Sequence, residues 1–274
     1  SYIANSNTDN IIISGFFGYG LVSIYGAYSY FIEAINKVIN SIIVSPINSF
    51  GNLFNDKKRE TYSIFMELYS FATFMGTIIS VCIFVVINQL VFYWIGDSSY
   101  VLSKLASFFF AINIFYMTQR EPVIICRDTN GLFKNAVGNS YLIAITKIIL
   151  SIVLIQKYQI IGILIATSIS WWVVDFLYNP VLVYKKVFNF NPLRYYKLIF
   201  SRLIILFSTG LIAELIWNNF LVMSNDNMLN FLLACIILGI FVAIIVFTIY
   251  VIAYESFRNV LKRLLLLVRR KRNA

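Results

Sequence analysis

Histidine is absent from the 274-residue sequence, and cysteine, proline and charge are scarce. There are three cysteines and four prolines, and only 12% of the residues are charged. Cys82, Cys126 and Cys235 are far apart and form no C-x-x-C motif. A disulfide framework and the usual histidine- and cysteine-based zinc sites are therefore not expected. We predict no metal site and no cofactor.

The elements of a hydrolytic or nucleotide-driven enzyme are also missing. Without histidine, and without a serine or cysteine in a nucleophile-elbow motif, a hydrolase triad is not available. The phosphate-binding motif G-x-x-x-x-G-K-[ST] does not occur. We predict no catalytic residues and a protein that is not an enzyme. No basic-aromatic module is visible, so nucleic acid is not expected as a partner.

Apolar residues are what the sequence has in excess. They make up 60% of the chain, and the mean hydropathy is +0.81, whereas a soluble domain is about 45–50% apolar and about 25% charged. We predict an all-α, polytopic membrane protein. A bilayer core takes about 20 helical residues to cross, which divides the sequence into about eight spans, at 10–30, 31–54, 62–94, 101–118, 135–156, 160–184, 198–217 and 228–254.

The basic residues alternate between the connections of this layout. The connections after the second, fourth, sixth and eighth spans contain most of the lysines and arginines, whereas the opposite connections hold only Lys104 and Lys157. The positive-inside rule then places both ends of the chain in the cytoplasm. Membrane topology thus accounts for the net charge of +10. Arg120 and Arg127 belong to the cytoplasmic connection after the fourth span.

Polar residues gather on one side of the span 31–54. They include Glu33, Asn36, Lys37, Asn40 and Asn48, with Ile32, Ile35, Ile39 and Ile42 on the other side. A charge at the bilayer centre costs about 2.5–3.5 kcal/mol and usually faces a cavity or a partner. We interpret the span as a helix whose polar side faces water inside the protein. The alternative is that Glu33 and Lys37, four residues apart, neutralise each other.

Three further charges lie within apolar segments. Lys147 and Asp175 are on adjacent spans at similar predicted depth, so we expect an ion pair between their helices. Asp9 lies at the start of the first span, where a carboxylate either caps a helix N-terminus or contributes polarity to a transport pathway.

Five segments in order resemble a known family of membrane proteins. They are NTDNIIISGFFG, VSIYGAYSYFIEAINKVINSII, GNLFNDKKRETYSIFMEL, FYMTQREPVIICRDTNGLFKNA and NPVLVYKKVF. Together they cover about residues 7–188 and resemble the second half of Wzx-type polysaccharide flippases, in the multidrug/oligosaccharidyl-lipid/polysaccharide exporter superfamily. The resemblance implies two six-helix lobes around a cavity, often followed by two extra helices. Residues 1–188 would be the second lobe, 189–254 the extra pair and 255–274 a basic cytoplasmic tail, and we expect a first lobe to be missing from the printed sequence.

The resemblance implies translocation of an undecaprenyl-pyrophosphate-linked oligosaccharide across the bacterial cytoplasmic membrane, for capsule, exopolysaccharide or O-antigen synthesis. Membrane lipids, a polysaccharide polymerase and other assembly proteins would be partners. The candidate substrate-binding residues are Asn36, Lys37, Asn40, Asn48, Arg120, Arg127 and Lys147, and the candidate ion-coupling residues are Asp9, Glu33 and Asp175. The alternatives are a drug or cation exporter of the same superfamily, a membrane polysaccharide polymerase or ligase, and a non-transporting scaffold.

Overall fold

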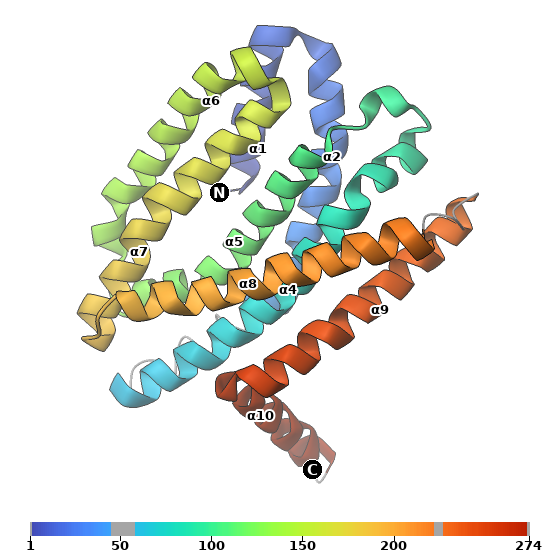
Figure 1. Cartoon of the computed structure of the whole chain (residues 1–274). Helices are drawn as coiled ribbons and strands as arrows, with labels where there is room; N and C mark the ends of the chain where they lie inside the picture. The colour runs from blue at the N-terminus through green and yellow to red at the C-terminus, as the bar shows by residue number, and fades with distance from the viewer. Residues whose placement is uncertain (1, 45–57, 222–226, 273–274) are drawn as a thin grey trace.

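The computed structural model describes residues 2–44, 58–221 and 227–272, and within these ranges every regular element is helical. Asn48 lies outside the described residues. The helices are α1 Tyr2–Phe17, α2 Tyr19–Ile39, α4 Lys58–Ile95, α5 Lys104–Thr129, α6 Phe133–Ile169, α7 Phe176–Val183, α8 Leu193–Ile216, α9 Met228–Ala253 and α10 Glu255–Arg272 (Figure 1). Shorter helical segments are η1 Asn40–Val44, η3 Ser98–Tyr100, η4 Ser170–Asp175, η5 Tyr184–Phe188 and η6 Trp217–Leu221.

Part of the described chain is long and apolar enough to cross a membrane. The segments are Thr61–Ile95, Phe133–Phe188, Leu193–Leu221 and Met228–Ala253. Their outward surfaces are apolar as well; on α9 the exposed side chains include Leu229, Leu232, Leu233, Ile236, Ile237 and Ile240. Exposing such an extensive apolar surface to water is unfavourable, whereas contact with the hydrocarbon of a bilayer is not. The predicted class, an all-α membrane protein, is confirmed at this level.

The segment Phe133–Phe188 is a hairpin. Gln159 has a φ of 50° and a ψ of −131°, and the chain reverses there (Figure 1). Gly162, on the returning arm, packs against the backbone of the first arm, where an added Cβ would lie 2.5 Å from the carbonyl carbon of Leu154. A side chain at Gly162 would therefore push the two arms apart. The predicted connection at 157–159 is confirmed.

The turn between the first two helices is not where the sequence pattern placed it. Gly18, with a φ of 71°, separates α1 from α2, and the segment from Tyr19 to Ile39 is one helix. The predicted boundary near residue 30 is therefore wrong. The reason is that the left-handed backbone needed for the reversal is open to glycine, while Tyr28 and Ser29 are buried within the helix.

Helix α5 also departs from the prediction. It runs through Pro122 to Thr129 because Val123, Ile125 and Cys126 stay buried against neighbouring helices. Arg120 and Arg127, predicted to lie in a connection, are therefore helical. A spacing of seven residues puts them on the same side of α5, two turns apart.

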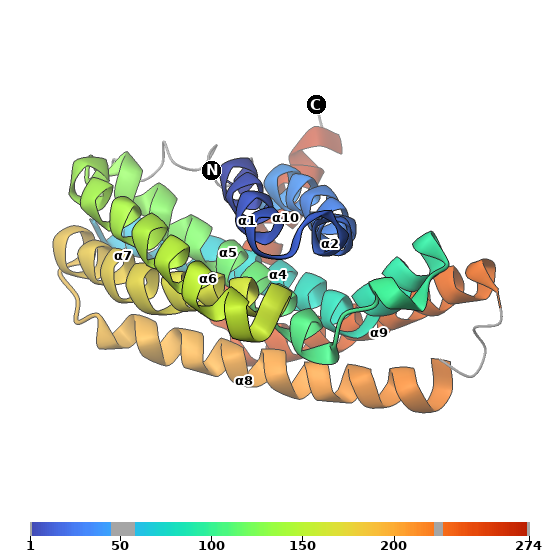
Figure 2. The same ribbon diagram turned by 90° about the horizontal axis from the view of Figure 1, so that it is seen from above.

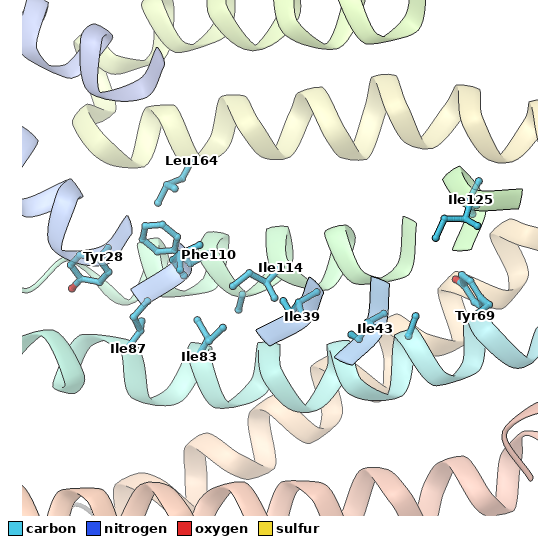
Figure 3. Close-up of a cluster of buried hydrophobic side chains, with 14 of the residues drawn as sticks. Tyr28, Ile39, Ile43, Tyr69, Ile83, Ile87, Phe110, Ile114, Ile125 and Leu164 are labelled. Carbon is cyan, nitrogen blue, oxygen red and sulfur yellow. The ribbon is translucent and has the colours of Figure 1, made fainter. Parts of the chain in front are cut away.

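Helices α4 and α5 form the centre of the bundle. One side of α4 packs with α2 and α5, and α6 packs on α5. The shared cluster includes Tyr28, Ile39, Ile43, Ile83, Ile87, Phe110, Ile114 and Leu164 (Figure 3). Its other side packs with α8 and α9 in a second cluster that includes Val81, Val85, Leu206, Phe231, Leu238 and Val242. Because α4 is covered on two sides, its small polar residues Ser70, Thr73, Thr77 and Ser80 are buried together with its apolar ones. Seen from above, α1 and α2 lie on one side of this centre and α8 on the opposite side (Figure 2).

Candidate functional site

A buried ion pair joins α1 to α6. The Lys147 Nζ atom lies 2.9 Å from Asp9 Oδ1 and donates a hydrogen bond to Asp9 Oδ2 at 3.1 Å. The Tyr25 hydroxyl, from α2, donates to the same Oδ2 atom at 2.9 Å. Asp9 and Lys147 are each 4% exposed. Three helices thus meet at one charged group of low accessibility.

The local sequence explains why these side chains point inward. On the first arm of α6 the buried positions are Ala136, Asn139, Lys147, Ser151 and Ile155, which recur at helical spacing, while apolar residues between them are exposed. On α1, Asp9 and Ile13 are one turn apart and both buried. Each charge therefore lies on the inward stripe of its helix, which is where a partner can be found.

A small cavity adjoins the pair. Its volume is about 40 Å³, and its polar lining includes Asp9, Tyr25, Asn113, Lys147 and Thr167. The side-chain oxygen Oδ1 of Asn113 accepts a hydrogen bond of 2.8 Å from the Ser168 hydroxyl. A cavity of this size has room for a few water molecules, which need two to four polar partners each. The ion pair therefore has room for water beside it.

A second polar cluster surrounds Asp175, which is 1% exposed. Its Oδ2 atom lies 2.8 Å from Arg120 Nε and accepts a hydrogen bond of 2.9 Å from the Tyr116 hydroxyl. The amides of Asn139 and Asn179 also donate to its Oδ1 atom. One carboxylate thus connects α5 with both arms of the hairpin.

Arg127 extends the same cluster by two turns. Its Nη1 atom donates to Asn179 Oδ1 at 2.9 Å, and its Nε atom lies 2.7 Å from Asp128 Oδ1. Arg120 and Arg127 are therefore engaged with protein side chains. An incoming anion at either position has to compete with these partners.

The expected ion pair between Lys147 and Asp175 is wrong. Lys147 pairs with Asp9 and Asp175 with Arg120. The register of the hairpin is the physical reason, because it places Asp175 opposite Asn139, two turns and about 12 Å along the helix from Lys147. The capping role considered for Asp9 is also wrong, since α1 begins at Tyr2 and Asp9 lies in its middle.

Much of the polar side of α2 is open at the surface of the described bundle. Ile32, Ile39 and Ile43 are buried in the bundle, whereas Lys37 and Asn40 are exposed. The interpretation that this side faces water inside the protein stays a prediction, because the described residues show only that Lys37 and Asn40 are open to the outside of this bundle. The apolar side turns inward because α4 and α5 offer it an apolar surface.

Asn36 is the exception on this face. It is 4% exposed, and neither atom of its amide has a hydrogen-bond partner in the described structure. Glu33 is half-buried. Asn36 therefore lies on the inward side of α2 with Ile32 and Ile39, and Glu33 lies at the edge of that side.

The sequence did not reveal the uncharged members of these sites. Tyr25, Asn113, Tyr116, Asn139 and Asn179 carry the hydrogen bonds, and their only signal was polarity within an apolar segment. Arg202 of α8 is another charged residue in the interior, where it is fully buried. Its Nη2 atom donates to Ser70 Oγ at 3.2 Å, and its guanidinium carbon lies 4.8 Å from the ring centroid of Tyr250.

The fold and these clusters define a helical membrane protein with charged groups in its interior. Within the described ranges, no three histidine, cysteine, aspartate or glutamate side chains gather to hold a metal ion. Comparisons with protein-family models, with curated proteins and with solved structures found no match for the chain.

Proposed function

We propose that the protein is the second half of a polysaccharide flippase. It would move an undecaprenyl-pyrophosphate-linked oligosaccharide across the bacterial cytoplasmic membrane. The observation that carries the proposal is the buried Asp9–Lys147 pair beside a small cavity, because charges inside a membrane bundle usually mark a transport pathway or its coupling site. The proposed substrate is taken from the five sequence segments that resemble the flippases.

In the proposed architecture, about eight spans make up a six-helix lobe and two extra helices. A cytoplasmic tail follows them. The reversals at Gly18 and Gln159 support the helix order of the lobe. The exposed side of α2, with Lys37 and Asn40, would face the other lobe across the central cavity. Sugar hydroxyls would meet its asparagines, and the polyprenyl tail would stay in lipid.

The mechanism we propose is an exchange of ion-pair partners. A pyrophosphate that binds Lys147 releases Asp9, which then takes up a proton. At the cytoplasmic end, an anion that binds Arg120 would release Asp175 in the same way, and one that binds Arg127 would release Asp128 and Asn179. Rocking of the lobes then exposes the headgroup on the other face, as in other transporters built from repeats. Between the lobes, Lys37 would bind the phosphate of the headgroup and Glu33 would take up the coupling ion.

Export in cells tests this proposal. In a strain that lacks the chromosomal gene, the complete gene product should restore surface polysaccharide. The double variant Asp9→Asn, Lys147→Met removes both charges together, and it should reach the membrane at normal abundance yet restore no polysaccharide. The matched control Asp97→Asn, Lys157→Met changes the same residue types at exposed positions and should restore export.

Full export by the double variant would refute a role for the pair in transport. If the complete product instead lowers the accumulation of cationic dyes and leaves surface polysaccharide unchanged, the drug-exporter alternative would replace the flippase.

A further inference from the structure

An apolar crevice lies between α4, α5 and α8, on the opposite side of α5 from the α6 hairpin. Its volume is about 150 Å³, and its walls include Ser80, Phe84, Phe108, Ala111, Phe207 and Gly210. The Phe108 and Phe207 rings stack across it with centroids 6.3 Å apart. An added Cβ at Gly210 would meet no atom within 4 Å. The missing side chain of Gly210 therefore leaves the crevice open.

Two opposite charges lie at one end of the crevice. Lys104 precedes Phe108 by one turn of α5, and Glu214 follows Gly210 by one turn of α8. Lys104 Nζ lies 2.6 Å from Glu214 Oε2, and the two side chains are 43% and 25% exposed. Lys104 Nζ is also 4.4 Å from the ring centroid of Phe84. An apolar channel thus ends at an accessible pair of charges of both signs.

Among the lining residues named above, Ser80 is the one with a polar side chain. Ser80 is fully buried, and its hydroxyl has no hydrogen-bond partner in the described structure. It lies one turn of α4 from Phe84, about 6 Å deeper than the charged end. A buried hydroxyl without a partner costs free energy. An acceptor at this depth would remove that cost.

We propose that the crevice binds one phospholipid with a zwitterionic headgroup, of the phosphatidylethanolamine type. An acyl chain fills the crevice, since an apolar cavity of this size stays free of water and accepts apolar guests. The phosphate meets Lys104, the ammonium group meets Glu214, and a glycerol ester carbonyl accepts the hydrogen bond of Ser80. A purely anionic headgroup would instead meet the Glu214 carboxylate, so charge complementarity selects the zwitterion.

Native mass spectrometry of the full chain tests the site. The protein, purified in mild detergent, is supplied with dioleoyl phosphatidylethanolamine and dioleoyl phosphatidylglycerol in equal amounts. The wild type should retain one phosphatidylethanolamine in preference to phosphatidylglycerol. Gly210→Phe fills the crevice and should lower its occupancy about tenfold. Gly239→Phe on α9, where an added Cβ also meets nothing within 4 Å, should not change the occupancy.

Glu214→Gln is the second variant, at a position exposed enough to leave the fold intact. It leaves Lys104 without its counter-charge, and the preference should shift about tenfold toward phosphatidylglycerol. Equal occupancy in Gly210→Phe and Gly239→Phe would overturn the proposal. So would equal binding of the two lipids by the wild type, unchanged in Glu214→Gln, because the crevice would then hold bulk lipid without selection. Neither result depends on transport activity.

Discussion

Replacing Lys147 by methionine isolates the energetic consequence of the buried ion pair. Methionine keeps most of the aliphatic length of lysine, so the packing of α6 is largely retained. What changes is that the Asp9 carboxylate, 4% exposed, keeps only the hydrogen bond from Tyr25 among the contacts described above. Removing one partner of a buried pair costs about 3–5 kcal/mol of stability.

Protonation of Asp9 sets an upper limit to this cost. An aspartate with an ordinary pKa of about 3.9 can be protonated at pH 7 for about 4 kcal/mol, at about 1.36 kcal/mol per pH unit. We therefore expect Lys147→Met to lower the free energy of unfolding by about 3–4 kcal/mol at pH 7. At pH 5 the limit falls to about 1.5 kcal/mol. The destabilisation should thus shrink as the pH is lowered.

Equilibrium unfolding in mixed micelles, followed by circular dichroism at the two pH values, measures these quantities. Lys157→Met is the matched control, because Lys157 is exposed, and it should change stability by less than about 0.5 kcal/mol. The double variant Asp9→Asn, Lys147→Met should regain most of the loss, since replacing a whole buried pair is often neutral. A single variant as stable as the wild type at pH 7, or a cost that does not change at pH 5, would refute the reasoning.

Two further predictions concern the hairpin and the topology. Gly162→Ala should destabilise the protein by about 1–3 kcal/mol in the same unfolding assay, because its Cβ would meet the Leu154 backbone; Gly138→Ala, which meets nothing within 4 Å, should be neutral or slightly stabilising, and equal behaviour of the two would contradict the tight hairpin. In a chain without its native cysteines, single cysteines at Asn130 and Ser99 should react with an impermeant maleimide from opposite sides of the membrane. Labelling of both from one side would contradict the proposed topology.

The parts of the fold that could be predicted are those set by local composition. The membrane class follows from the length and hydropathy of segments such as Met228–Ala253, because a bilayer selects on these quantities alone. The reversal near Gln159 was predicted because the short polar stretch 157–159 interrupts two apolar runs. The turn at Gly18 was missed because Gly15, Gly18 and Gly20 lie close together in one apolar run, and the sequence does not show which of them has the positive φ.

The candidate site shows where local composition stops being informative. The sequence identified Asp9, Lys147 and Asp175 as charges inside apolar segments, since such residues are costly whatever surrounds them. It could not identify their partners. A partner depends on the rotation of each helix and on the register between helices, and a shift of two turns separates Asp175 from Lys147. Tyr25 and Asn179 were missed for the same reason, because an uncharged polar residue becomes informative only when its neighbour is known.

Composition and hydropathy alone determined that this chain is a bundle of apolar helices with a few buried charges. Tertiary structure decided which charges meet, that the apolar side of α2 turns inward, and that Arg202 lies against tyrosine rings. The physical reason is that the two effects depend on different parts of the chain. Transfer from water into hydrocarbon acts on each segment independently, whereas an ion pair requires two atoms from distant segments to lie within about 4 Å of each other, which only the packing of whole helices can arrange.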